Sequence, residues 1–187
     1  MVIAYGQLGT QTIAVSPDGM YAAIGGSEMV VPANVTDRLQ RMQQTTFAST
    51  INIVDLRNHS VAQVIQAEAR GPIAWSPDGA RIALAGQLYA EMFDSQTGKR
   101  LVHDKIEKSG TMNVQFTPDG RYFIEIDLNG MGRGLGVKIW DNTRHKLLQE
   151  IPGDIGGIAI SRDGKYLAVG TTGRTTIWQF KGAELSP

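Results

Sequence analysis

A four-residue turn recurs four times along the chain, and it constrains the fold more than any other feature. The copies read SPDG at 16–19 and 76–79, TPDG at 117–120 and SRDG at 161–164. Proline presets φ at about −65°, aspartate bonds to its own backbone, and glycine supplies the positive φ that re-aims the chain. Short apolar segments precede and follow each copy. Each copy is therefore predicted to be the corner of a β-hairpin.

The spacing of the turns indicates a repeated unit of strands. The turn aspartates are separated by 60, 41 and 44 residues, and the two shorter gaps match the roughly 40 to 45 residues of a propeller blade. A third apolar segment follows each hairpin, and three units also have a fourth. The sequence thus predicts an all-β fold in a single domain over 1–187, with four blades at about 11–66, 72–106, 112–151 and 156–180.

These residues resemble the WD40 repeat family, through the SPDG turns and through Ile139-Trp140-Asp141 at the end of a third strand. The resemblance implies a β-propeller, a fold that hosts many unrelated functions. Two departures stand out: the Gly-His pair usual before the first strand is absent, and the third-strand tryptophan occurs only at Trp140 and Trp178. The TolB-like repeats, which have similarly spaced turns, are an alternative relative.

Ring closure is the least determined part of this fold. The last blade ends in a polar tail, KGAELSP, so the apolar segment 2–5 is predicted to complete it as a strand. Four blades lie at the low end for propellers. Three arrangements stay open: a closed four-blade ring, two copies sharing one eight-blade ring, or a half-ring completed by another protein or by further residues. An incomplete ring is favoured, because its open end would expose an apolar patch that needs a partner.

Composition narrows the classes of partner and location. The 187 residues are 42% apolar, and the 18 basic and 18 acidic side chains cancel. Because the chain has no net positive charge to attract polyanions, nucleic acid and anionic membrane are not expected as partners. There is no cysteine, which fits a reducing compartment. The start of the sequence does not read as a secretory signal, and no run approaches the roughly 20 apolar residues of a membrane helix. We therefore expect a cytoplasmic protein.

An insertion at 27–49 is the first candidate partner-binding segment. After Pro32, the run 37–44 is predicted to be a short helix, with Leu39 and Met42 on one side and Arg38 and Arg41 on another. The insertion is interpreted either as a partner-binding arm or as a tolerated loop packed against the same face, because surface loops accept extra length at small entropic cost.

A glycine-rich segment at 127–136 is the second candidate. It has glycine at four alternate positions, and Met131 and Arg133 lie among them. Backbone amides and an arginine can approach an anion, but the spacing matches neither the dinucleotide fingerprint nor a P-loop. A plain hairpin loop is the competing interpretation.

No catalytic, cofactor or metal residues are predicted. His59 and His145 occupy matching turns of different blades and His103 lies in an outer strand, so the three histidines are not expected to share a metal ion. The four turn aspartates are explained by the turns that repeat them. The three tryptophans are expected to pack between blades.

The sequence therefore predicts a non-catalytic protein–protein interaction or scaffolding module, which docks partners through the face bearing 27–49 and 127–136. It needs no cofactor. One alternative is a small-ligand sensor or enzyme with a site at the propeller axis, built from loops such as 107–111 and 152–156. Another is a regulatory propeller domain excised from a larger enzyme.

Overall fold

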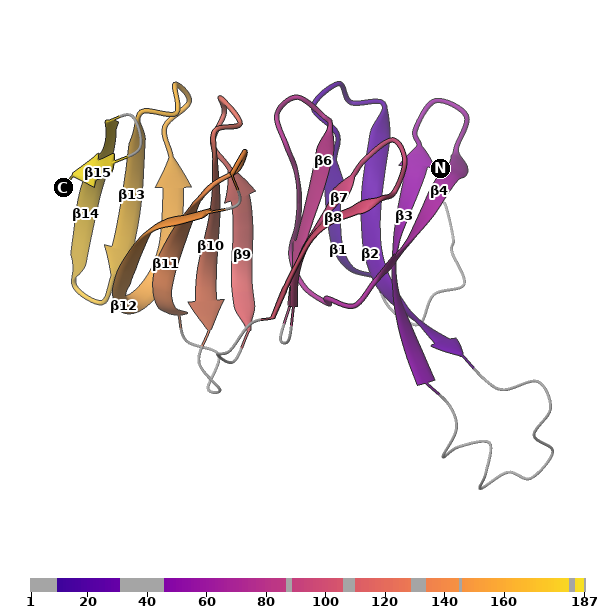
Figure 1. The fold of residues 1–187 in the computed structure, drawn as a ribbon, viewed down its shortest axis with the longest axis horizontal. Helices are drawn as coiled ribbons and strands as arrows, with labels where there is room; N and C mark the ends of the chain where they lie inside the picture. The colour runs from indigo at the N-terminus through magenta and orange to yellow at the C-terminus, as the bar shows by residue number, and fades with distance from the viewer. Residues whose placement is uncertain are drawn as a thin grey trace.

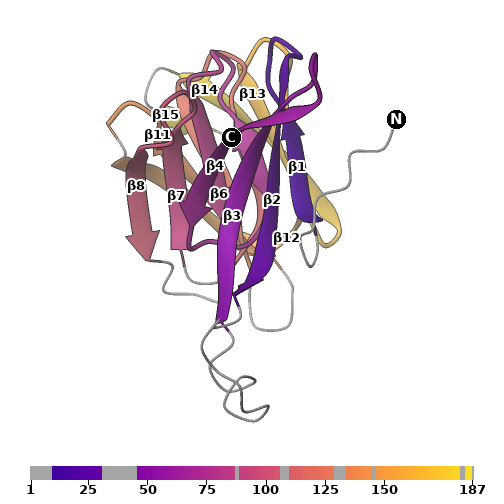
Figure 2. The same ribbon diagram turned by 90° about the vertical axis from the view of Figure 1, so that its right-hand side faces the viewer.

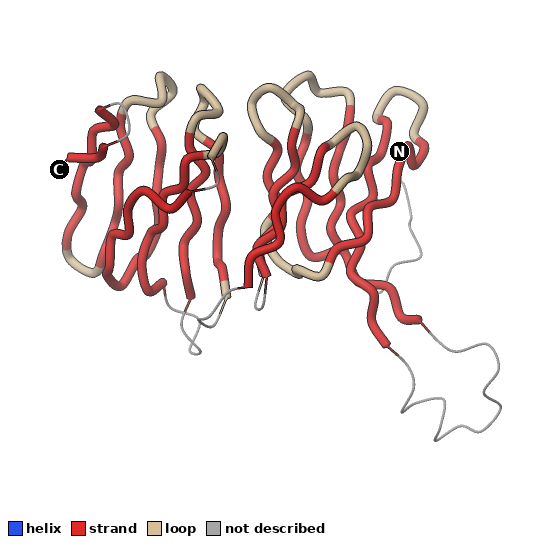
Figure 3. The backbone as a smooth tube through the Cα atoms, in the orientation of Figure 1, coloured by secondary structure: helices blue, strands red, loops and turns tan. Residues whose placement is uncertain are grey.

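The chain is built from strands and turns (Figures 1 and 3). A computed structural model describes residues 10–30, 46–86, 89–105, 110–128, 134–144, 146–181 and 184–186. These ranges contain no helix, and hence none that is long and apolar enough to cross a membrane. The predicted all-β class is confirmed.

The strands form three antiparallel sheets, in each of which chain neighbours pair. The first sheet contains β1 (Thr10–Val15), β2 (Tyr21–Val30), β3 (Thr46–Asp55) and β4 (Ser60–Ala67). The second contains β5 (Ile73–Trp75), β6 (Arg81–Ala85), β7 (Tyr89–Asp94) and β8 (Arg100–Lys105). The third contains β9 (Thr111–Phe116), β10 (Tyr122–Leu128), β11 (Gly134–Asp141), β12 (Lys146–Ile160), β13 (Tyr166–Thr171), β14 (Arg174–Lys181) and β15 (Glu184–Ser186).

The third sheet consists of two four-stranded parts that share β12. Residues 146–152 of this strand pair with β11, and residues 155–160 pair with β13. The described chain thus holds four similar units. Unit 1 is β1–β4, unit 2 is β5–β8, unit 3 is β9–β11 with the start of β12, and unit 4 is the end of β12 with β13–β15.

The outer strand of unit 4 is β15, at the carboxyl end of the chain. Its Leu185 lies opposite Phe180 of β14, and Ser186 lies opposite Gln179. The prediction that segment 2–5 takes this position is not confirmed, and residues 1–9 lie outside the described ranges. A local hairpin closes a much shorter loop than a junction between the two chain ends, so its entropic cost is smaller.

The four units stand side by side in an open row (Figure 1), and Figure 2 views the row from the end that carries unit 1. The first strands of neighbouring units contact each other, β1 with β5 and β5 with β9. Units 1 and 4 lie at opposite ends of the row, and between their described strands there is no contact beyond a marginal one. The described part of the chain therefore forms an arc, with one free face at each end.

The hydrophobic core lies between the units. Ile51, Ile82 and Phe93 belong to a cluster between units 1 and 2. Phe116 and Phe123 belong to a second cluster between units 2 and 3, and a third cluster lies between units 3 and 4. Units 2 and 3 therefore bury both of their faces, which is why strands such as β6 and β10 have consecutive buried residues.

The repeated turns share one hydrogen-bond pattern. In the first turn, the Ser16 hydroxyl donates to Asp18 Oδ1 at 2.5 Å, the Met20 amide donates to the same oxygen at 2.9 Å, and the Tyr21 amide donates to Ser16 Oγ. The other three turns repeat these bonds. The serine hydroxyl holds the pKa of Asp18 below its usual value, and the Met20 amide adds to this effect. The structural role predicted for the turn aspartates is confirmed.

A Gly19→Ala variant is expected to lose about 1 kcal/mol of unfolding free energy, because Gly19 has φ +70° and a Cβ is strained there even though no neighbour would touch it. Urea denaturation, monitored by tryptophan fluorescence, measures the loss of unfolding free energy. Gly156→Ala is the matched control, since Gly156 does not have positive φ and its new methyl group would make only an ordinary contact. Equal losses in the two variants would contradict the turn geometry.

Candidate functional site

The predicted partner-binding residues of the insertion lie outside the described residues. These are Arg38, Leu39, Arg41 and Met42, and the helix expected at 37–44 lies there too. The ends of the insertion are described: β2 and β3 continue into it as a paired ribbon, with Ser27 opposite Ser49 and Val30 opposite Thr46. The insertion predicted over 27–49 is therefore partly regular strand.

The glycine-rich segment is shorter than predicted. Asp127 and Leu128 end β10 and Gly134 begins β11, so only 129–133 falls between these strands. Met131 and Arg133 lie in that gap, outside the described residues. The β2–β3 and β10–β11 connections join equivalent strands of two units, as the sequence suggested. Their role in docking stays a prediction.

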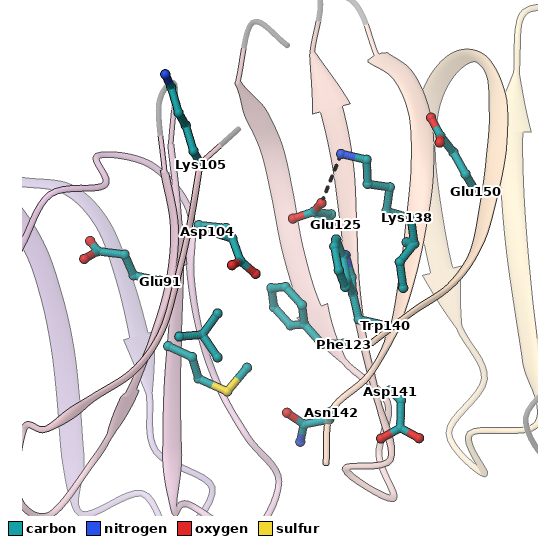
Figure 4. Close-up of a pocket in the computed structure, with 14 residues that line it drawn as sticks. Glu91, Asp104, Lys105, Phe123, Glu125, Lys138, Trp140, Asp141, Asn142 and Glu150 are labelled. Atoms are coloured by element: carbon teal, nitrogen blue, oxygen red, sulfur yellow. Dashed lines mark ion pairs between the residues drawn. The ribbon is translucent and has the colours of Figure 1, made fainter. Parts of the chain in front are cut away.

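A cavity of about 310 Å³ lies between units 2 and 3 (Figure 4). Ala90 of unit 2 lines it on one side, and Phe123 and Trp140 of unit 3 line it on the other. Met92 and Val102 complete the apolar wall on the unit 2 side. Arg81 links the two units at one end of the cavity, because its Nη1 donates a hydrogen bond to the Asn142 carbonyl at 2.7 Å. The volume is at the lower end of small-molecule sites.

Charged residues of unit 3 line this cavity beside the aromatic rings. Lys138 Nζ lies 2.9 Å from Asp127 Oδ2 and 3.5 Å from Glu125 Oε1. Glu125 and Asp127 are almost completely buried, and Asp127 Oδ1 has no hydrogen-bond partner among the described residues. Figure 4 shows Glu125 and Lys138 reaching toward each other above Phe123 and Trp140. Two carboxylates thus share one ammonium group.

Burial raises the pKa of Glu125, and the nearby Lys138 charge only partly opposes this effect. Burial also disfavours the charge of Lys138, but the hydrogen bond to Asp127 and the charge of Glu125 outweigh it and raise the pKa of Lys138. Perturbed groups in a cavity mark a candidate site. The only sequence signal for this site is the alternation of apolar and acidic residues at Ile124, Glu125, Ile126 and Asp127. This alternation resembles the pattern of an ordinary half-exposed strand.

A second polar cluster joins units 1 and 2. Glu68, Glu91 and His103 place ligand atoms within 4.8 Å of one another, a grouping of the kind that can hold a metal ion. Arg100 already binds this group, because its Nη1 donates to both glutamates at 2.8 Å. Glu91 also accepts hydrogen bonds from the backbone amides of Glu68 and Ala69. We interpret the cluster as an ion-pair network that fastens the linker between the two units.

The histidines occupy separate parts of the fold. His103 lies in the outer strand β8, as predicted, and stacks on Tyr89 with ring centroids 4.5 Å apart. Its Nε2 lies 3.5 Å from Glu68 Oε2, a partnership that the sequence did not suggest. His59 lies in the β3–β4 turn, and His145 is outside the described residues. The predicted packing of tryptophans between units is confirmed for Trp75, Trp140 and Trp178.

The first end of the arc is an apolar sheet face without a partner among the described residues. Ile13 and Val15 of β1 are 61% and 56% exposed. Their equivalents, three residues and one residue before the next turn, are Ile73 and Trp75, which pack between units 1 and 2, and Ile73 is only 7% exposed. We call this side of unit 1 the first end face. Its other exposed apolar residues are Val61 and Val64.

The far end of the arc is the side of unit 4 that points away from unit 3. Ile177 of β14 lies in register with Ala168 of β13, which pairs with Ala159 of β12. Ile177 is 53% exposed, whereas its equivalents in the other units are buried: Ile53, Met92 and Ile139. We call this side of unit 4, with Tyr166 at its edge, the last end face.

Comparison with known proteins identifies the fold. No protein-family model matches the sequence, and no curated protein does. The similar solved structures include Kuenenia stuttgartiensis hydrazine synthase, with TM-score 0.60 and 17% identity over 97% of this chain, and a Dos1 propeller, with TM-score 0.65 and 16% identity over 91%. The chain spans 59% and 41% of the lengths of these two proteins. At such identities the likeness shows the fold alone, and the described chain is an all-β assembly of the propeller type.

Proposed function

We propose that the chain forms four WD40-like blades and works as a non-catalytic protein–protein interaction or scaffolding module. The observation that carries this proposal is the pair of end faces, where Ile13, Val15 and Ile177 are exposed although their equivalents in the other units are packed between sheets. Exposed apolar side chains at positions that are otherwise covered indicate an interaction site. A protein partner fits better than nucleic acid, since the net charge is zero.

The predicted docking face, with the 27–49 insertion and the 127–136 loop, remains a second candidate surface of the same module. A cytoplasmic location also remains a prediction. The structure adds the two end faces to these expectations, because only the stacking of sheets determines which apolar residues are covered.

Affinity capture with the tagged chain in extract of the native source, read by mass spectrometry, tests the proposal. An Ile13→Lys/Ile177→Lys variant is expected to lose the proteins that the parent captures, because both end faces then carry charge of the same sign. Replacement of 31–45 by an Asn-Gly turn tests the predicted docking face and keeps the strand ends paired. Leu101→Lys is the control, since Leu101 is also exposed but lies on an outer strand of unit 2.

The outcomes separate the two surfaces. Loss with the end-face variant alone supports docking at the ends of the arc, and loss with the replacement of 31–45 alone supports the insertion face. If both variants capture the same proteins as the parent and the control, the interaction proposal is wrong.

A small-ligand sensor is the second candidate function, and the cavity between units 2 and 3 favours it. An aromatic wall beside the buried Glu125 and Lys138 suits a small amphipathic molecule. This cavity lies among second, third and outer strands, not at the axis where a ligand was expected. A domain of a larger enzyme is the remaining alternative, and the likeness to hydrazine synthase supports it only through the fold.

A further inference from the structure

We propose that the partner of the end faces is a second copy of this chain, and that two copies form one eight-bladed ring. In this ring, the last end face of each copy packs on the first end face of the other. The inference rests on the proposed function, and it names the partner. It is drawn from the junctions that the chain already contains.

The junction between units 1 and 2 shows what such a contact requires. Large side chains before the turn of unit 2 pack on small ones in unit 1, as when Trp75 contacts Ala14 and Ala23 lies in the same cluster. Two hydrogen bonds accompany this packing. Trp75 Nε1 donates to the Ala14 carbonyl at 3.0 Å, and the Ile73 amide donates to Thr12 Oγ1 at 3.2 Å.

The two free faces are the two halves of the same kind of junction. The first end face presents the large residues Ile13 and Val15, at the positions of Ile73 and Trp75. The last end face presents Ala159 and Ala168, at the positions of Ala14 and Ala23. Each face therefore has the size pattern that the other would meet in a continued row of units.

The turns show the same continuity. A methyl group placed on Gly79 would lie 3.9 Å from Pro17 of the preceding turn, and one on Gly120 would lie 3.8 Å from Pro77. Gly164 repeats this contact with Pro118, but a methyl group on Gly19 would meet nothing within 4 Å. The glycines of the second, third and fourth turns thus each lie beside the turn of the preceding unit. Among the four described turns, the first lacks such a neighbour.

The ring junction would place position 162 of unit 4 beside this first turn. The fourth turn has Arg162 where the others have proline. An arginine here would approach the exposed carboxylate of Asp18, which keeps its charge because hydrogen bonds lower its pKa. The departure from the repeat therefore substitutes an attractive charge pair for a proline contact.

Symmetry selects a second copy over an unrelated protein. One two-fold axis would bury both end faces of both copies in two identical junctions, and no face would stay free. The same contact without closure would build an open filament. Eight blades also fall within the known range of propellers. An unrelated partner would instead need to match two different faces of this chain at once.

Sedimentation velocity of the purified chain tests the proposal directly. The parent is expected to sediment as a dimer of the 20.3 kDa chain. Ile13→Lys and Ile177→Asp are each expected to weaken self-association by about a hundredfold, because every junction in either homodimer then contains one buried charge. Leu101→Lys should associate like the parent.

Mixing the two variants provides the sharpest test. In a mixed dimer one junction keeps both parental residues. The other junction brings the lysine introduced by Ile13→Lys in one copy toward the aspartate introduced by Ile177→Asp in its partner, so the two buried charges are opposite in sign. The mixture should therefore regain dimers that neither variant forms alone. Circular dichroism and thermal unfolding show whether each variant is folded before mixing.

Several results would overturn the shared ring. A parent that stays monomeric at about 100 μM, well above the dissociation constants of stable dimers, would do so without any variant. Filaments would contradict closure, and dimers that the two substitutions leave unchanged would place the interface elsewhere. A monomeric parent whose captured proteins are lost with the end-face variant would refute the second copy and retain the proposed function.

Discussion

A Lys138→Met variant is expected to lose about 3 kcal/mol of unfolding free energy at neutral pH. Lys138 is the ammonium group shared by Glu125 and Asp127, which are almost completely buried. Its removal leaves two carboxylates without their positive partner in a place that water hardly reaches. Breaking a buried pair in this way typically costs about 3 to 5 kcal/mol. We take the lower value because the Lys138 side chain is itself partly exposed.

The loss should depend on pH with a defined sign. Without Lys138, the folded-state pKa of Glu125 rises further above its unfolded value, because the charge that opposes the effect of burial is gone. A group with a raised folded pKa favours the folded state below the unfolded pKa, and this contribution is lost as pH rises through the folded pKa. The deficit of the variant should therefore be small near pH 4 and grow toward pH 7, as urea denaturation at both values would measure.

Two features allow the difference between pH 4 and pH 7 to be assigned to Glu125. Hydrogen bonds from Arg57 lower the pKa of Asp55 to about 2, so that ion pair stays charged at pH 4. Lys165→Met is the control, because Lys165 and Asp163 are both well exposed and 3.9 Å apart, and such pairs contribute little. A Lys138→Met deficit that is equal at pH 4 and pH 7 would show that the loss comes from packing and not from charge.

A Phe93→Ala variant is expected to lose about 3 to 5 kcal/mol of unfolding free energy, the typical cost of deleting a fully buried phenyl ring. Phe93 of β7 is the largest fully buried side chain in the described structure and lies in the cluster between units 1 and 2. Its removal leaves a cavity among Ile51, Ile53 and Ile82, whose positions are fixed by pairing within two sheets.

Differential scanning calorimetry of Phe93→Ala, Phe93→Leu and Leu101→Ala measures this effect. Phe93→Leu should recover more than half of the loss because it refills much of the space. Leu101 is 41% exposed on β8, so its truncation should change stability by less than about 1 kcal/mol. A Phe93→Ala loss no larger than that of Leu101→Ala would mean that units 1 and 2 do not pack as described.

The strands and turns were predictable because their signals are local. The turn from Ser16 to Gly19 carries its own hydrogen-bond pattern, so four similar copies predict four similar corners. The apolar runs on either side then follow as strands. This reasoning requires only neighbours within a few residues, and the described strands β5 to β11 lie close to the predicted segments.

The closing strand and the cavity were not predictable, because their signals are weak or nonlocal. β15 has Leu185 as its only apolar residue opposite β14, which is too little to distinguish a strand from a polar tail. Glu125 and Asp127 alternate with isoleucines, a pattern typical of a strand with one face in water. When sheets stack, the second face is covered as well, so alternation no longer indicates exposure. Only the packed structure shows that these carboxylates are buried.

The shared strand β12 has a consequence for how the molecule comes apart. Because one uninterrupted strand closes unit 3 and opens unit 4, local opening of either unit disturbs the hydrogen bonds of the other. Amide protons of units 3 and 4 are therefore expected to exchange as one cooperative group. Units 1 and 2, in contrast, are separate sheets that the short 68–72 linker connects along the chain. A chain break at Gly153 would therefore disturb two units at once, because it cuts the strand that they share.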